Sequence, residues 1–89
     1  MSNNENNKSE TYIKVAKVIA EQLPVDENKI SLDVTFDSLG ADSLEQIEIL
    51  MKVEEIFNIE ISDEEADKVT FVKDLVTCID RVISKNSIL

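Results

Sequence analysis

The scarcity of glycine and proline limits the fold of this chain more than any other feature of its sequence. The 89 residues include one glycine, Gly40, and one proline, Pro24. An all-β fold needs many turns, and turns depend heavily on these two residue types. Apolar residues recur instead at spacings of three and four, as on the buried face of a helix. The sequence therefore predicts an all-α fold, a small four-helix bundle of three main helices and one short helix, with a long first loop.

Four segments carry this helical spacing, and a polar tail precedes them. The predicted helices run from Ser9 or Glu10 to Leu23, from Ser43 to about Phe57, over a short stretch after the N-cap Ser62, and from Thr70 or Phe71 to about Lys85. Residues 1–9 are rich in asparagine and predict a disordered N-terminal tail, and residues 86–89 are expected to fray. One folded domain over residues 10–85 follows from this division.

The expected core is aliphatic, because the chain has only four aromatic residues. Its predicted members are Val15, Ile19, Leu23, Phe36, Ile49, Val53, Phe57, Val69, Val72, Leu75 and Ile79. Ile56 is also placed on the core face of the second helix, and Ile83 on the buried stripe of the last. Between Pro24 and Leu39, spaced apolar residues are expected to pin the long loop to this core.

The composition excludes most catalytic and metal chemistry. The chain has no histidine, which removes the usual general base and the commonest metal ligand. Its single cysteine, Cys78, can form no internal disulfide and is interpreted as a buried or half-buried residue of the last helix. An EF-hand starting at Asp33 fails at its sixth and twelfth positions, Ser38 and Leu44. We therefore expect no enzyme activity, no catalytic residue and no specific metal site.

The acidic charge is concentrated in the middle of the chain. The formal net charge is −10, and residues 37–67 contain eleven acids and one base, Lys52. The remaining residues contain eight acids and eight bases. Nucleic acid is an unsuitable partner because its phosphates would be repelled. A protein with a basic patch suits this segment, and the alternative is an acidic surface that serves only solubility.

The second predicted helix begins at the stretch Gly40-Ala41-Asp42-Ser43-Leu44-Glu45. Asp42 suits an N-cap, and Glu45 lies three residues on, in the spacing of a capping box. Ser43 is then the first helical residue, with its hydroxyl exposed near the end of the helix. A phosphate ester on that oxygen would meet free N–H groups and the positive end of the helix dipole.

The side of this helix that points away from the core, which we name the outer face, combines apolar and acidic residues. At about 100° per residue, it is made up of Leu44, Ile47, Glu48, Met51, Glu54 and Glu55. Three large apolar residues in line with a charged rim are typical of a docking site. The alternative is a helix buried on both sides, but so small a chain leaves little to cover the second side.

The chain resembles the acyl carrier proteins from about Thr11 to Ile83. The resemblance rests on the stretches Leu39-Gly40-Ala41-Asp42-Ser43-Leu44, Ile47-Glu48-Ile49-Leu50-Met51, Val53-Glu54-Glu55-Ile56-Phe57 and Ile61-Ser62-Asp63-Glu64-Glu65-Ala66. In that family the serine of Asp-Ser-Leu carries 4′-phosphopantetheine, so the resemblance assigns this attachment to Ser43, beside Asp42. It also implies an acyl carrier domain at residues 10–85, and partner enzymes that recognise Leu44, Glu45, Ile47, Glu48, Met51, Glu54 and Glu55.

The function implied by the resemblance is to carry growing fatty acyl chains as thioesters in dissociated fatty acid synthesis. A phosphopantetheinyl transferase would modify Ser43 from coenzyme A, and fatty acid synthesis enzymes with basic patches would then bind the protein. The growing chain would fold back between the helices. A D-alanyl, peptidyl or polyketide carrier is the nearest alternative. A non-carrier acidic adaptor, with Ser43 as a plain helix residue, is an alternative from another class.

The sequence also leads to expectations about location and assembly. No N-terminal apolar run resembles a signal peptide, and no segment is long enough to span a bilayer. We expect a monomer without a membrane partner, in a bacterial cytoplasm or in an organelle after removal of a targeting segment.

Overall fold

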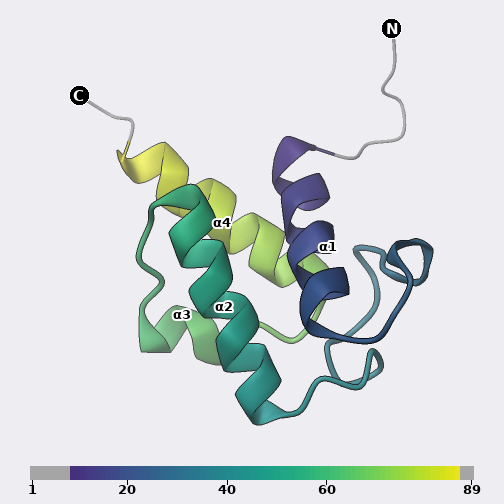
Figure 1. Cartoon of the computed structure of the whole chain (residues 1–89). Helices are drawn as coiled ribbons and strands as arrows, with labels where there is room; N and C mark the ends of the chain where they lie inside the picture. The colour runs from purple at the N-terminus through teal and green to yellow at the C-terminus, as the bar shows by residue number, and fades with distance from the viewer. Residues whose placement is uncertain (1–8, 87–89) are drawn as a thin grey trace, which may run out of the picture.

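The all-α architecture is confirmed by a computed structural model, which describes residues 9–86 (Figure 1). Its helices are α1 (Glu10–Gln22), α2 (Ser43–Phe57), α3 (Asp63–Asp67) and α4 (Val72–Asn86). The first helix packs against both α2 and α4, and a single 3-10 turn, η1 (Glu27–Lys29), lies in the long connection that follows it. No helix within residues 9–86 has the length and apolar character needed to cross a bilayer.

The ends of the helices follow from local hydrogen bonds. The Ser9 hydroxyl accepts the N–H of Tyr12 at 3.1 Å, so this residue caps α1. The backbone of Leu23, the residue before Pro24, is extended and ends the helix. At the other end of the chain, Asn86 is the last residue of α4. The rest of the predicted tail and of the predicted frayed end, residues 1–8 and 87–89, lies outside the described residues.

The core is aliphatic, as predicted. Its most completely buried side chains are those of Val15, Val18, Ile19, Ile49, Val53, Val72, Leu75 and Ile79. The predicted core residues Leu23 and Phe36 are also buried. Phe57 and Val69 are only partly buried, although both pack against the core.

Two predicted positions are wrong, because Ile56 and Ile83 are exposed by 50% and 36%. Ile56 lies at the edge of the core-facing stripe, where the helix is about to end. Asn58 then adopts the left-handed conformation, with φ of 56°, and the chain turns sharply. This turn brings Ile59, rather than Ile56, into the core at the end of α2.

The long connection between α1 and α2 is fastened to the start of α4. The N–H of Phe36 donates to the carbonyl of Thr70 at 3.1 Å, and the N–H of Val72 donates to that of Val34 at 2.9 Å. Nearer to α1, the Tyr12 hydroxyl donates to the buried carbonyl of Ile30 at 2.8 Å. The spaced apolar residues between Pro24 and Leu39 pack against the core, as predicted. The connection is therefore attached to α1, to the start of α4 and to the core before it reaches α2.

Candidate functional site

The long connection ends in a tight turn that leads directly into α2. Gly40 has a φ of +88°, a conformation that a residue with a side chain rarely adopts. Its N–H donates to the carbonyl of Asp37 at 3.0 Å, and the N–H of Ala41 donates to that of Phe36 at 3.1 Å. Ala41 is itself buried. The turn is therefore fixed to the core one residue before the helix cap.

The predicted capping box at the start of α2 is confirmed. The Asp42 carboxylate accepts the N–H of Glu45 at 2.8 Å, and the Glu45 carboxylate accepts the N–H of Asp42 at 3.1 Å. The two side chains thereby satisfy backbone donors that a helix N-terminus otherwise leaves without acceptors. This pair sets where the helix begins, and so where Ser43 lies.

Gln46 is a further fixing residue that the sequence analysis did not identify. Its side-chain amide donates to the carbonyl of Ala41 at 3.2 Å and to the Asp37 carboxylate at 3.4 Å. Both acceptors lie in the turn, so Gln46 ties the first turn of α2 back to the loop. In the sequence it is an ordinary polar residue of a helix, and no local pattern marks this contact.

Ser43 is the first residue of α2, and its side chain is exposed. The N–H groups of Ser43 and Leu44 belong to the first turn, whose N–H groups have no carbonyl acceptor within the helix. A phosphate ester on the Ser43 oxygen would therefore lie at a helix end suited to negative charge. The exposure of the hydroxyl also leaves it open to a modifying enzyme, so the residues present fit a phosphate-linked group.

The outer face of α2 is exposed, as predicted. Leu44, Ile47 and Met51 are exposed by 63%, 53% and 59%, and they run along the helix from the Ser43 end. The carboxylates of Glu48 and Glu55 lie beside them in solvent. The alternative of a helix buried on both sides is thereby excluded within the described part of the chain.

Glu54 differs from the other carboxylates assigned to the outer face. Its side chain is half-buried, and one oxygen accepts the N–H of Ile61 at 2.8 Å. This bond holds the segment between α2 and α3. The predicted place of Glu54 rests on its angle on the helix, and that angle carries no information about a contact seven residues away.

A narrow apolar crevice lies behind α2, close to the serine end of the helix. Its walls include Phe36, Leu50, Ala66 and Val69, and its volume is about 20 Å³. Such a volume holds about one water molecule. A larger apolar group would therefore have to displace one of the walls. One of these walls belongs to α3, a helix of five residues, none of them buried.

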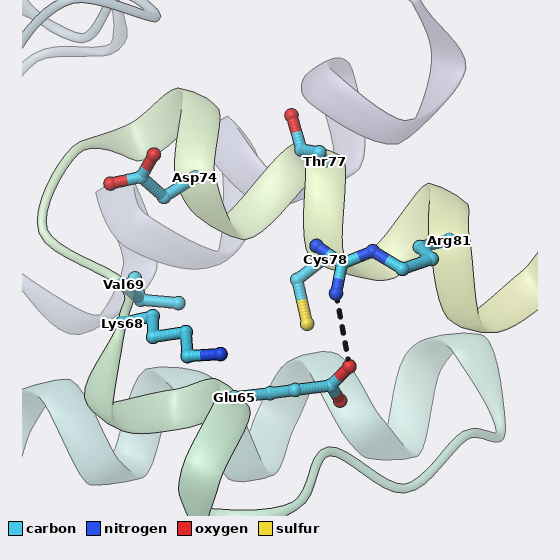
Figure 2. A pocket seen from close by; sticks show the side chains of 7 residues that line it. All are labelled: Glu65, Lys68, Val69, Asp74, Thr77, Cys78 and Arg81. Atoms are coloured by element: carbon cyan, nitrogen blue, oxygen red, sulfur yellow. Dashed lines mark hydrogen bonds and ion pairs between the residues drawn. The ribbon is translucent and has the colours of Figure 1, made fainter.

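A second cavity, of about 140 Å³, lies on the other side of α3 and contains the Cys78 side chain (Figure 2). Cys78 is buried, as predicted, and its sulfur is directed between α3 and α4. Burial raises the pKa of this thiol, and the nearby Glu65 carboxylate raises it further. Arg81 contacts Glu65 at 3.2 Å and closes one side of the cavity. No element of this cavity belongs to the Ser43 junction.

The chain is similar both to a family model and to solved structures. A family model described as a phosphopantetheine attachment site matches residues 14–79. Among solved structures, the fold is similar to an acyl carrier protein from Thermotoga maritima, with a TM-score of 0.80 and 26% sequence identity. That match covers 96% of this chain and 100% of the other.

Proposed function

Because this chain belongs to the family of proteins with a phosphopantetheine attachment site, we propose that Ser43 bears the prosthetic group and that the cargo is a growing fatty acyl chain. Membership of this family makes the chain a carrier protein rather than an enzyme. It implies that the prosthetic group is 4′-phosphopantetheine. It also implies modification by a phosphopantetheinyl transferase. We propose which residue is modified, which cargo is carried and which partner enzymes bind.

The observation that carries the proposal is the position of the Ser43 hydroxyl. It is exposed at the first turn of α2, inside the matched segment, and the capping box of Asp42 and Glu45 fixes its place. Gly40 and Gln46 hold the turn that precedes it. Because the link to the serine is covalent, it does not require the acidic surface to attract a phosphate.

When bound, the prosthetic group supplies a thiol that carries the cargo as a thioester. The contribution of this chain is to present the attachment point beside a docking surface. Leu44, Ile47 and Met51 would make the apolar contacts with partner enzymes, and Glu45, Glu48 and Glu55 would steer basic patches toward them. Glu54 would add its charge to this field, while its carboxylate remains bound to Ile61.

The crevice behind α2 supports an apolar cargo. Its walls are aliphatic apart from Phe36 and Gln46, and Ala66 of α3 is one of them. An acyl chain that folds back between the helices would have to push α3 aside, since the resting volume is about 20 Å³. This makes a fatty acyl group a better fit than a polar aminoacyl group such as D-alanine. An acylated form whose chain lies wholly in solvent by NMR would contradict this part of the proposal.

Intact-mass measurement tests the attachment site. The unmodified protein is incubated with coenzyme A and a phosphopantetheinyl transferase, and we expect the mass to rise by one phosphopantetheinyl group. Ser43→Ala should abolish the gain, whereas Ser31→Ala, at an exposed serine of the long connection, should retain it. An adduct that persists in Ser43→Ala would disprove the assignment. The absence of any adduct would favour the adaptor alternative.

A second measurement tests the cargo. The modified protein is offered malonyl-coenzyme A, an acetyl-coenzyme A primer and a nicotinamide reductant, with a malonyl transferase and the elongating enzymes of dissociated fatty acid synthesis. We expect a series of masses that grows by two carbons. Efficient loading by a D-alanyl or aminoacyl ligase, without elongation by the fatty acid enzymes, would assign the chain to another class of carrier.

A further inference from the structure

A shallow groove lies between the C-terminal end of α1 and the middle of α2, at the edge of the outer face. Gln22 of α1 lines one side, and Glu48, Met51, Lys52 and Glu55 of α2 line the other. The groove has a volume of about 300 Å³, and the four α2 side chains are exposed. The groove can therefore receive side chains of another protein. It also extends the exposed surface of α2 as far as α1.

Lys52 gives this groove an alternating charge pattern. Lys52 is the one basic residue in the segment 37–67, which also contains eleven acidic residues. Glu48 precedes it by four residues and Glu55 follows it by three, so all three lie on the same side of the helix. At about 1.5 Å per residue, the two glutamates are about 10 Å apart along α2, with Lys52 between them. The stripe is negative, then positive, then negative.

The charge of Lys52 is not neutralised by an ion pair within residues 9–86. The ion pairs in this part of the chain join Lys73 to Asp33 and Arg81 to Glu65. A partner with an uninterrupted row of basic residues would therefore place a cation against Lys52, and like charges across an interface are unfavourable. A partner with a carboxylate at that point would be complementary at all three positions.

We propose that this groove receives a helix of a partner enzyme in which one acidic residue, opposite Lys52, lies between two basic residues. The inference rests on the proposed function, since it concerns the enzymes that the carrier serves. Lys52 then acts as a specificity-determining residue, because it disfavours partners whose basic patch continues across the groove. Gln22 extends the contact to α1, beyond the outer face.

Two synthetic helical peptides test this proposal. Each peptide has three residues on one helix face, spaced by four and three positions as are Glu48, Lys52 and Glu55. The two outer residues are arginines in both peptides. The central residue is glutamate in one peptide and lysine in the other. In NMR titrations of the apo protein, we expect amide shifts at Gln22 and residues 48–55. The peptide with the central glutamate should bind about two- to fivefold more tightly.

Variants separate the role of Lys52 from the effect of overall charge. Lys52→Glu should reverse the preference between the two peptides. Lys17→Glu makes the same change in net charge at an exposed residue of α1 outside the groove, and should leave the preference as it is. Equal affinities in the wild type, a preference that survives Lys52→Glu, or shifts confined to other residues would each overturn the proposal.

Two further controls ask whether a second copy of the chain fills the groove and whether peptide binding depends on Ser43. Analytical ultracentrifugation at the concentrations of the titration should show a monomer. Self-association with shifts at the same amides in the absence of peptide would assign the groove to a second copy of the chain and overturn the proposal. The Ser43→Ala variant should bind both peptides as the wild type does. A negative peptide result is therefore distinct from a failure of Ser43 to be modified.

Discussion

The guanidinium of Arg81 contacts the carboxylate of Glu65 at 3.2 Å and joins α4 to α3 beside the Cys78 thiol (Figure 2). This contact holds a helix that has no buried residue of its own. Because α3 lines both the Cys78 cavity and the apolar crevice, we expect a change in its attachment to α4 to alter both. The Cys78 thiol, which is buried between α3 and α4, should therefore report on the position of α3.

We expect the rate of Cys78 labelling by a thiol reagent to depend on Glu65. In the apo protein Cys78 is the single thiol, and its burial and raised pKa should make labelling slow. Glu65→Gln removes the ion pair and one cause of the raised pKa, and should speed labelling about two- to fivefold. Asp33→Asn removes the more exposed pair with Lys73 and should have no effect. Equal rates in the two variants would contradict the role given to Glu65.

Glu54 should matter for stability more than its neighbour on the helix. Glu54→Ala leaves the N–H of Ile61 without its carboxylate acceptor, and should lower the free energy of unfolding by about 1–2 kcal/mol. Glu55→Ala, at an exposed position of the same helix, should change it by less than about 0.5 kcal/mol. Urea denaturation measures both values. Similar losses in the two variants would mean that the bond to Ile61 contributes nothing particular.

Stability at low pH should depend on Asp74. Its carboxylate accepts the N–H groups of Phe71 at 2.9 Å and Thr70 at 3.0 Å, and these bonds lower its pKa. The unfolded chain binds this proton at a higher pH, near the ordinary pKa of about 3.9. The stabilisation is therefore complete above that value and is lost as pH falls through the lower pKa of the folded state.

Comparison of Asp74→Ala with the wild type measures this effect. The difference in the free energy of unfolding should be constant from neutral pH to about pH 5 and should shrink below about pH 4. Asp26→Ala serves as the control, because that side chain makes no cap hydrogen bond. A difference for Asp74→Ala that grows on acidification would show that the sign is wrong.

Charge reversal at Glu48 should weaken partner binding without unfolding the chain. Glu48→Lys changes an exposed side chain, so the free energy of unfolding should change little. The kcat/KM of a phosphopantetheinyl transferase for this variant should fall about two- to tenfold at low salt, and the deficit should shrink as salt rises. Glu21→Lys makes the same charge change on α1 and should have a smaller effect. A transferase rate insensitive to salt would contradict electrostatic steering.

The elements that the sequence predicted well are those set by neighbouring residues. The bounds of α2 and its capping box depend on Asp42 and Glu45, which are three residues apart, and both were identified. The exposed ridge of Leu44, Ile47 and Met51 followed from the helical repeat alone. Local rules sufficed because these features need no knowledge of the rest of the fold.

The features that the sequence did not predict depend on contacts between elements. Gln46, Glu54 and the pair of Glu65 with Arg81 each bond to a residue outside their own helix. Ile56 was misplaced because the left-handed turn at Asn58 ends α2 and brings Ile59 into the core. The helical repeat gives the direction of a side chain from its own axis but not which neighbouring element it meets.

The hydrogen bonds between residues 32–36 and 70–73 have a consequence for the timing of modification. The segment that presents Ser43 is braced by residues about thirty positions further along the chain. Ser43 is therefore synthesised well before the residues that brace its segment. A transferase that recognises the folded junction can act only after residues 70–73 have taken their place against the long connection.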